Sequence, residues 1–254
     1  MVKRVTFSGV LLAGLLMQVG CVTEIEEPVF QKSDPQRFTE VSIAAAAEYI
    51  KEGNAETAFK HLKRALEKAP KSPEAHNAMA LVYRLTGDKK LEEKHFKLSL
   101  RYDSTLSKAR NNYATFLYNE NRYKEALKQL KKAANDPGYE NRAVAFENMG
   151  RCYLKLADLE KAEEAFLSAT RADGRMSRSY LELADIAFKK NDRQGAADYV
   201  EQYGLLARHT PRSLWLGIQV QRVVGDRDKL ASYELALRKL YPNSAEYQAY
   251  IQSE

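Results

Sequence analysis

Residues 143–176 read AVAFENMGRCYLKLADLEKAEEAFLSATRADGRM, and this stretch decides the fold. Gly150 and Tyr153 are followed at helical spacings by Ala162, Phe166 and Ala169. Small residues let two helices approach closely, and large residues fill the space between neighbouring helices. The stretch therefore predicts a pair of tightly packed helices.

The same residue types recur along the chain at a nearly constant interval. Units begin near residues 39, 73, 107, 143, 177 and 211, so the spacings are 34, 34, 36, 34 and 34. Thirty-four residues is the period of tetratricopeptide repeats, in which stacked helix pairs bury a continuous core. We predict an all-α, right-handed superhelical solenoid of six such repeats, with about 12 helices and a C-terminal capping helix. The expected units are 39–72, 73–106, 107–142, 143–176, 177–210 and 211–244, and the cap is 245–254.

Four departures from the repeat pattern are visible, three of them single residues and one an insertion. Glu92 stands where the second repeat should have alanine, and Val200 and Glu234 occupy the phenylalanine position of repeats five and six. Two extra residues precede repeat four, within the turn-rich segment Asn135-Asp-Pro-Gly-Tyr139. We expect that segment to hold them outside the helices.

The composition favours a helical chain, and its charge pattern is not that of a nucleic-acid binder. Of 254 residues, 44% are hydrophobic and 29% charged, with only 12 Gly and 7 Pro, so helices are favoured. Without residues 1–20 the chain has 38 basic and 34 acidic residues, a mild excess. Because Lys and Arg alternate with Glu along the expected helices, we predict no nucleic-acid partner.

The N-terminus has the pattern of a secretory signal peptide over residues 1–20. Lys3 and Arg4 precede the apolar run 10–17, which is too short to span a membrane. Gln18-Val-Gly-Cys21 resembles the lipobox of bacterial lipoproteins, although the first position is usually aliphatic. The resemblance implies acylation of Cys21, and Val22 after it implies the periplasmic face of the outer membrane. Residues 21–38 are predicted to be a lipidated tether.

No catalytic, metal or cofactor site is expected. His61 and His95 lie 34 residues apart, which makes them equivalent positions of two repeats and not a ligand pair. If Cys21 is acylated, Cys152 has no disulfide partner, and it reads as a small buried residue. Without a phosphate loop or nucleophile motif, we expect a non-enzymatic chain.

A binding surface is predicted on the first helix of each repeat, whose projecting positions line the concave face of such solenoids. Amide, aromatic and arginine side chains at these positions suit capture of a peptide or helix. The candidate residues are Asn77, Arg84, Asn111, Thr115, Tyr118, Glu147, Arg151, Asp185, Phe188 and Trp215. The sequence leaves open whether a partner binds this face, the opposite face or one edge.

Four segments give the chain a more specific resemblance. Asn111-Asn-Tyr-Ala-Thr-Phe-Leu-Tyr118, Phe146-Glu-Asn-Met-Gly150, Arg212-Ser-Leu-Trp-Leu-Gly217 and Leu240-Tyr-Pro-Asn-Ser244 resemble the PilF/PilW family. The resemblance covers about residues 39–250 and implies a monomeric outer-membrane pilotin of type IV pilus biogenesis, which assists localisation and multimerisation of the secretin PilQ. The alternative is another lipid-anchored repeat adaptor, such as one that recruits cell-wall enzymes.

Overall fold

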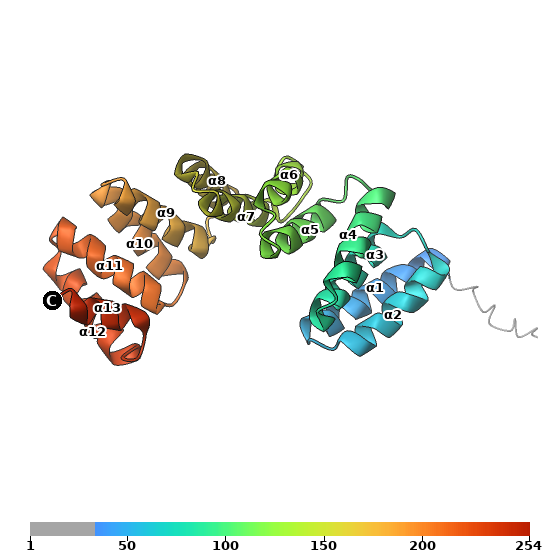
Figure 1. The fold of residues 1–254 in the computed structure, drawn as a ribbon, viewed down its shortest axis with the longest axis horizontal. Helices are drawn as coiled ribbons and strands as arrows, with labels where there is room; N and C mark the ends of the chain where they lie inside the picture. Colours follow the sequence, from blue (N-terminus) through green and yellow to red (C-terminus); the bar gives the residue numbers. More distant parts are fainter. Residues whose placement is uncertain (1–33) are drawn as a thin grey trace, which may run out of the picture. The chain divides into compact units, whose positions relative to one another are not determined.

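The computed structural model describes residues 34–254, which form thirteen helices and no strand (Figure 1). The predicted signal peptide, Cys21 and most of the predicted tether lie outside the described residues. In chain order the helices are α1 (Pro35–Lys51), α2 (Ala55–Lys68), α3 (Pro73–Thr86), α4 (Lys89–Tyr102), α5 (Ser107–Asn119), α6 (Tyr123–Ala134), α7 (Arg142–Lys155), α8 (Leu159–Ala172), α9 (Ser177–Lys189), α10 (Arg193–Leu206), α11 (Pro211–Val224), α12 (Arg227–Leu240) and α13 (Ala245–Gln252). The predicted all-α solenoid of helix pairs is confirmed.

Each repeat is a helix pair joined by a turn that needs a left-handed backbone conformation. The residue in that conformation recurs at one repeat position, with φ between 57° and 91°. It is Gly53, Gly87, Asn121, Ala157, Asn191 and Gly225 in repeats one to six. Glycine and asparagine tolerate this region, whereas alanine is strained there. The six equivalent turns fix where each first helix ends.

The residue after this turn caps the second helix in five of the six repeats. Asn54, Asp88, Asp158, Asp192 and Asp226 each accept a hydrogen bond from a backbone N–H in the first turn of the helix that follows. Such caps satisfy donors that have no partner within the helix. In repeat three the position is Arg122, which instead donates to Glu93 and Glu125.

The connections between repeats follow the spacing of the units. Four of them have four residues, whereas residues 135–141 make a seven-residue connection before repeat four. The extra residues therefore lie between helices, as expected. At the other end α1 begins at Pro35, so residues 35–38 are helical although the sequence predicts a tether there. Proline is common in the first turn of a helix, which accounts for the earlier start.

The core is built from the small and large residues of the repeat pattern. Ala162, Phe166 and Ala169 are fully buried, and Gly150 faces the ring of Phe166. A Cβ atom on Gly150 would lie 2.7 Å from two atoms of that ring, so the two helices meet where only glycine fits. Val200 is also fully buried and takes the place of phenylalanine in repeat five.

Repeat two departs from this apolar pattern. Glu92, at the alanine position, is buried, and its carboxylate accepts a hydrogen bond of 2.7 Å from Arg84 Nε on α3. Arg84 also donates to the backbone oxygen of Asn112, and its guanidinium lies 5.6 Å from the centre of the Phe96 ring. Burial raises the pKa of Glu92 and Arg84 opposes that rise. The ion pair offsets part of the cost of a carboxylate inside the helix pair.

The last helix, α13, covers the end of the stack. Tyr250 packs with Leu214 and Ile218 of α11 and with Leu237 of α12. Ser244 caps α13 through the backbone N–H of Tyr247. This agrees with the predicted capping helix. Within residues 34–254, no helix is both long and apolar enough to cross a membrane.

Candidate functional site

The predicted binding residues all lie on first helices, α3, α5, α7, α9 and α11, as the repeat spacing requires. We call the surface formed by these helices and α1 the first-helix face. Asn77, Asn111, Glu147 and Trp215 occupy one repeat position on it, and Thr115, Arg151 and Asp185 occupy another, four residues further on. Arg84, Tyr118 and Phe188 occupy a third, three residues beyond that.

Asparagine side chains connect neighbouring repeats along this face. Asn112 Nδ2 donates to Asn77 Oδ1 over 3.0 Å, and Asn148 Nδ2 donates to Asn111 Oδ1 over 3.1 Å. Asn77 and Asn111 are buried. A buried amide costs free energy unless it is hydrogen-bonded, so these bonds hold successive first helices in register. The sequence placed Asn77 and Asn111 on this face but did not identify their partners.

Arg151 and Tyr118 form a partly exposed group on the face. The Arg151 guanidinium lies 4.5 Å from the centre of the Tyr118 ring, and its Nη1 donates to Asn148 Oδ1 over 3.2 Å. Arg151 forms no ion pair with any residue in the described range, and both side chains are half-buried. Nearby, the Thr115 hydroxyl donates to the backbone oxygen of Asn111. Tyr118 and Arg151 thus offer a stacked ring and a cation without a carboxylate, which suits a protein ligand.

The acidic residues of the face are held by arginine or serine from the next repeat. Glu147 accepts a hydrogen bond from the Ser179 hydroxyl over 3.0 Å, and Arg178 lies 4.0 Å away. Arg212 forms a bidentate pair with Glu182, at 2.6 and 2.8 Å, and lies 3.7 Å from Asp185. Asp185 also pairs with Lys189. These contacts tie repeat four to five and repeat five to six.

The two aromatic candidates near the C-terminus are half-buried by packing. Phe188 packs against the core of repeats five and six. Trp215 lies against Tyr250 of α13, with ring centres 6.5 Å apart, and Arg222 lies 5.9 Å from the Trp215 ring. Both side chains stay partly exposed, and a binding role for them stays a prediction.

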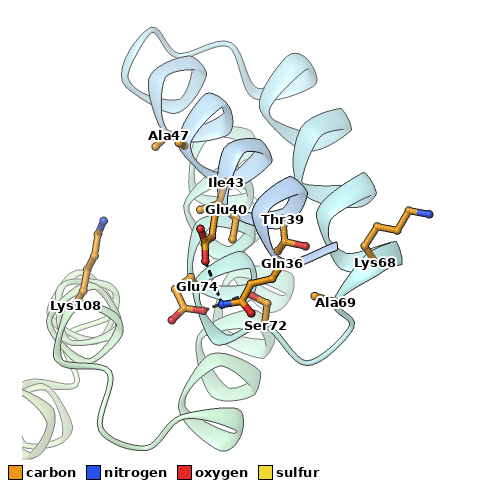
Figure 2. A pocket seen from close by; sticks show the side chains of 11 residues that line it. Gln36, Thr39, Glu40, Ile43, Ala47, Lys68, Ala69, Ser72, Glu74 and Lys108 are labelled. Atoms are coloured by element: carbon orange, nitrogen blue, oxygen red, sulfur yellow. Dashed lines mark hydrogen bonds between the residues drawn. The ribbon is translucent and has the colours of Figure 1, made fainter. Parts of the chain in front are cut away.

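A groove opens at the first two repeats, which the sequence did not indicate (Figure 2). It has a volume of about 690 Å3 and is lined on the α1 side by Gln36, Thr39, Glu40, Ile43, Ala44 and Ala47. Lys68, Ala69, Ser72 and Glu74 line it near the junction of α2 and α3, and Lys108 reaches it from α5. Its mixed wall of alkyl groups and charges of both signs suits an amphipathic peptide segment.

The histidines form a pair that the sequence did not predict. His76 and His95, on α3 and α4, approach to 3.0 Å between their Nδ1 atoms, and His76 Nε2 lies 3.1 Å from the backbone oxygen of Pro70. Burial lowers the pKa of both rings, that of His95 to about 4. His61 instead stacks on Tyr49. In the described part of the chain, no group of three or more His, Cys, Asp or Glu residues could hold a metal ion.

Cys152 is fully buried in the core of repeat four, as predicted. Burial raises the pKa of its thiol to about 12, although Arg151 opposes the rise. A thiol without thiolate character is a poor nucleophile. Cys152 therefore contributes to packing.

Comparisons with known proteins agree with this architecture. The tetratricopeptide-repeat family matches residues 39–82 and 148–206. The type IV pilus assembly protein PilF of Pseudomonas aeruginosa is 34% identical over 251 residues, 98% of each chain. A solved structure of Pseudomonas aeruginosa PilF aligns with a TM-score of 0.83 and 34% identity, covering 87% of this chain and 99% of that chain. PilW, described as a widely conserved type IV pilus biogenesis factor, aligns with a TM-score of 0.72 and 24% identity, covering 84% and 98%.

Six helix pairs with a polar, partly open first-helix face define a tetratricopeptide-repeat protein, a class of scaffold in which neighbouring repeats build one extended surface. Within that class, the identity extends over nearly the whole of both chains. The chain belongs to the PilF/PilW family.

Proposed function

We propose that this chain is a non-enzymatic pilotin: a lipid-anchored protein of the outer membrane that helps the type IV pilus secretin, PilQ, to localise and multimerise. The observation that carries the proposal is the 34% identity to a type IV pilus assembly protein over 98% of both chains. The first-helix face supports the proposal, because it offers side chains typical of protein-binding surfaces, such as Tyr118 and Arg151. The Gln18–Cys21 segment supports the lipid anchor.

Two parts of the first-helix face are candidates for partner binding. One is the Tyr118 and Arg151 pair, a half-buried ring under a guanidinium that has no carboxylate partner in the described range. The other is the groove of repeats one and two, whose alkyl wall on α1 includes Ile43 and Ala47. An amphipathic segment of a partner would bury its apolar side chains in the groove and place its polar side chains against Tyr118 and Arg151.

Affinity capture from detergent-solubilised outer membrane tests the partner directly. The mature protein should retain the secretin. Retention of cell-wall enzymes without secretin would favour the alternative adaptor role and contradict the pilotin role. The variants Tyr118→Ala with Arg151→Ala, and separately Ile43→Asp, locate the contact, because each changes one candidate region. Unchanged capture by the first variant would exclude the pair, and unchanged capture by the second would exclude the groove.

Cys21→Ser tests the anchor separately from partner binding. Acylation confines a protein to a surface and raises its effective concentration near a membrane partner, without adding a contact. We expect the variant to keep its helical circular dichroism signal and its capture of solubilised secretin. In cells it should leave the membrane fraction, with fewer or misplaced secretin rings. Wild-type membrane fractionation of this variant would contradict both the anchor and the outer-membrane location.

A further inference from the structure

Lysine occupies two equivalent positions on the second helices of the first three repeats. We call these positions the lysine rows; they are Lys60, Lys94 and Lys128 in one row and Lys63, Lys97 and Lys131 in the other. Neighbours within a row are 34 residues apart, and all six side chains are exposed on α2, α4 and α6. The repeat architecture therefore places lysine at equivalent positions of the second helices of three successive repeats.

The same positions in the last three repeats carry no cation. They are Glu164, Asp198 and Ser232 in the first row and Leu167, Glu201 and Leu235 in the second. The net charges of the helices follow this in part, because α2, α4 and α6 carry +2, +3 and +3 and α8 and α10 each carry −1, whereas α12 carries +2 away from the row positions. Three basic second helices are thus followed by two acidic ones, and the lysine rows end with α6.

Most of the row lysines have no carboxylate to neutralise them. Lys60 pairs with Glu56 and Lys97 with Glu93, but the other four form no ion pair within residues 34–254. Along α4, a groove of about 670 Å3 is lined by Lys90, Leu91, Glu93, Lys94, Lys97, Leu98 and Arg101. One carboxylate among four cations leaves a positive surface there.

We propose that the lysine rows bind the anionic headgroups of a phospholipid surface. Lysine is a compact charge on a flexible stem, which suits a fluid layer of phosphates, whereas stereospecific pairing with protein carboxylates favours arginine. The twelve row positions of the six repeats carry no aromatic side chain, whereas a protein interface normally has aromatic anchors. Basic clusters of this size beside a membrane attachment are typical of binding to anionic lipid.

The position of the rows in the chain also favours a membrane. This part of the argument rests on the proposed lipid anchor. Thirteen residues, 22–34, lie between Cys21 and the start of α1, and an extended chain of that length reaches at most about 50 Å. An anchored chain therefore keeps its first repeats near the lipid surface. Because the rows lie on second helices, lipid contact there leaves the first-helix face available for a protein partner.

Vesicle binding by two charge-matched variants tests the inference. The row variant carries Lys63→Gln, Lys94→Gln, Lys128→Gln and Lys131→Gln; the control carries Arg193→Gln, Arg227→Gln, Arg238→Gln and Lys239→Gln. All eight side chains are exposed, and each variant loses four positive charges. Both variants and their parent are made in the full chain with Cys21→Ser, so that an acyl chain does not dominate vesicle binding. Any contribution of the N-terminal residues to binding is then the same in all three proteins. Partition is measured by co-sedimentation with phosphatidylcholine vesicles with and without phosphatidylglycerol.

We expect the row variant to bind phosphatidylglycerol vesicles about tenfold more weakly than the parent chain does. The control variant should bind them about as well as the parent chain. The difference should shrink in high salt and be absent on pure phosphatidylcholine. Equal loss in both variants, or no loss in the row variant, would overturn the inference. So would a row variant that keeps vesicle binding but no longer captures solubilised secretin, since the rows would then bind an acidic protein segment. If the parent chain captures no secretin while the vesicle difference remains, the proposed function fails and the lipid contact stands.

Discussion

Repeats two and four place different chemistry at the same positions of one helix pair. In repeat four, Gly150 lies against Phe166 and Ala162 is buried beside them, so the contact between the helices is apolar. In repeat two the residues equivalent to Gly150, Phe166 and Ala162 are Ala80, Phe96 and Glu92, all buried. Both phenylalanines are completely buried, so the packing is retained although one repeat contains a carboxylate.

The difference shows how the architecture accepts a buried charge. The Glu92 carboxylate is 6% exposed, and Arg84 reaches it from the last turn of α3 while its own side chain stays 32% exposed. Arg84 therefore keeps contact with water, and only one of the two charges is fully removed from it. Repeat two has a second polar contact in the His76–His95 pair. Repeat four has a strained turn instead, with Ala157 at φ 57°.

The largest effect is expected from breaking the apolar contact of repeat four. In Gly150→Leu even the first added atom would be 2.7 Å from the Phe166 ring, and Phe166 is fully buried and cannot move to solvent. We expect the free energy of unfolding to fall by about 3 kcal/mol, more than the helix propensity gained by replacing glycine. Urea unfolding followed by circular dichroism measures this. Gly174→Leu is the control, because a Cβ atom there meets nothing within 4 Å; an equal loss in both variants would contradict the assigned contact.

Removing the cation of repeat two should have the next largest effect. Arg84→Met leaves the Glu92 carboxylate buried without its ion partner, and we expect a loss of about 2 kcal/mol at neutral pH. Removing Arg84 should raise the pKa of Glu92 further, because burial then acts without its opposing charge. The difference in free energy of unfolding between variant and wild type should therefore shrink as the pH falls and the carboxyl becomes neutral. The double variant Arg84→Met with Glu92→Ala should recover most of the loss. If the double variant is as unstable as the single one, Glu92 is not the cause.

Protonation of the histidine pair should weaken repeat two at acid pH. Both folded pKa values lie below the usual 6.5, that of His95 at about 4, so the unfolded chain binds the protons first. The two neutral rings make their full contribution to the free energy of unfolding above about pH 6.5. As the pH falls from there to about 4, this contribution is lost, and the loss is on the order of 1 kcal/mol. Urea midpoints measured across this range for the wild type and for His95→Phe give the difference. A difference between the two proteins that does not change with pH would exclude the pair as the source.

The smallest effect is expected at the strained turn of repeat four. Ala157→Gly relieves a left-handed conformation that costs an alanine about 1 kcal/mol, partly offset by the greater freedom of glycine when unfolded. We expect a small gain in stability. Gly87→Ala makes the opposite change at the equivalent position of repeat two, where φ is 77° and no atom obstructs a Cβ. If both changes alter the urea midpoint in the same direction, backbone strain does not explain either.

The sequence predicts what depends on the repeat and misses what depends on pairing across helices. Gly150, Ala162 and Phe166 recur at fixed spacings, so their packing followed from the period. The role of Glu92 does not follow from the period, because the repeat spacing assigns its partner Arg84 to the binding face. Only the fold shows that Arg84 points to α4. Arg84 is therefore largely engaged within repeat two, and a binding role for it stays a prediction.

The site was predicted only in outline, for the same reason. The spacing placed Asn77 and Asn111 on the first helices, but their bonds to Asn112 and Asn148 connect helices that are 34 or more residues apart in sequence. The groove at α1 is lined by residues of four helices, α1, α2, α3 and α5, and no local pattern encodes how these come together. The lysine rows, in contrast, could have been found by aligning the repeats and comparing their charges.

The six equivalent turns also have a consequence for the rate of folding. Each turn closes a helix pair over about thirty residues, so most contacts form between residues near each other in sequence and the entropy lost in closing each loop is small. Chains with such low contact order fold quickly, and a repeat array can begin from any stable pair and extend to its neighbours. With glycine already at the left-handed position, the turns at Gly53, Gly87 and Gly225 form without strain, whereas Ala157 must adopt its strained conformation during folding. Nucleation should therefore favour the two ends of the stack, and growth should meet its slowest step where the fourth pair closes.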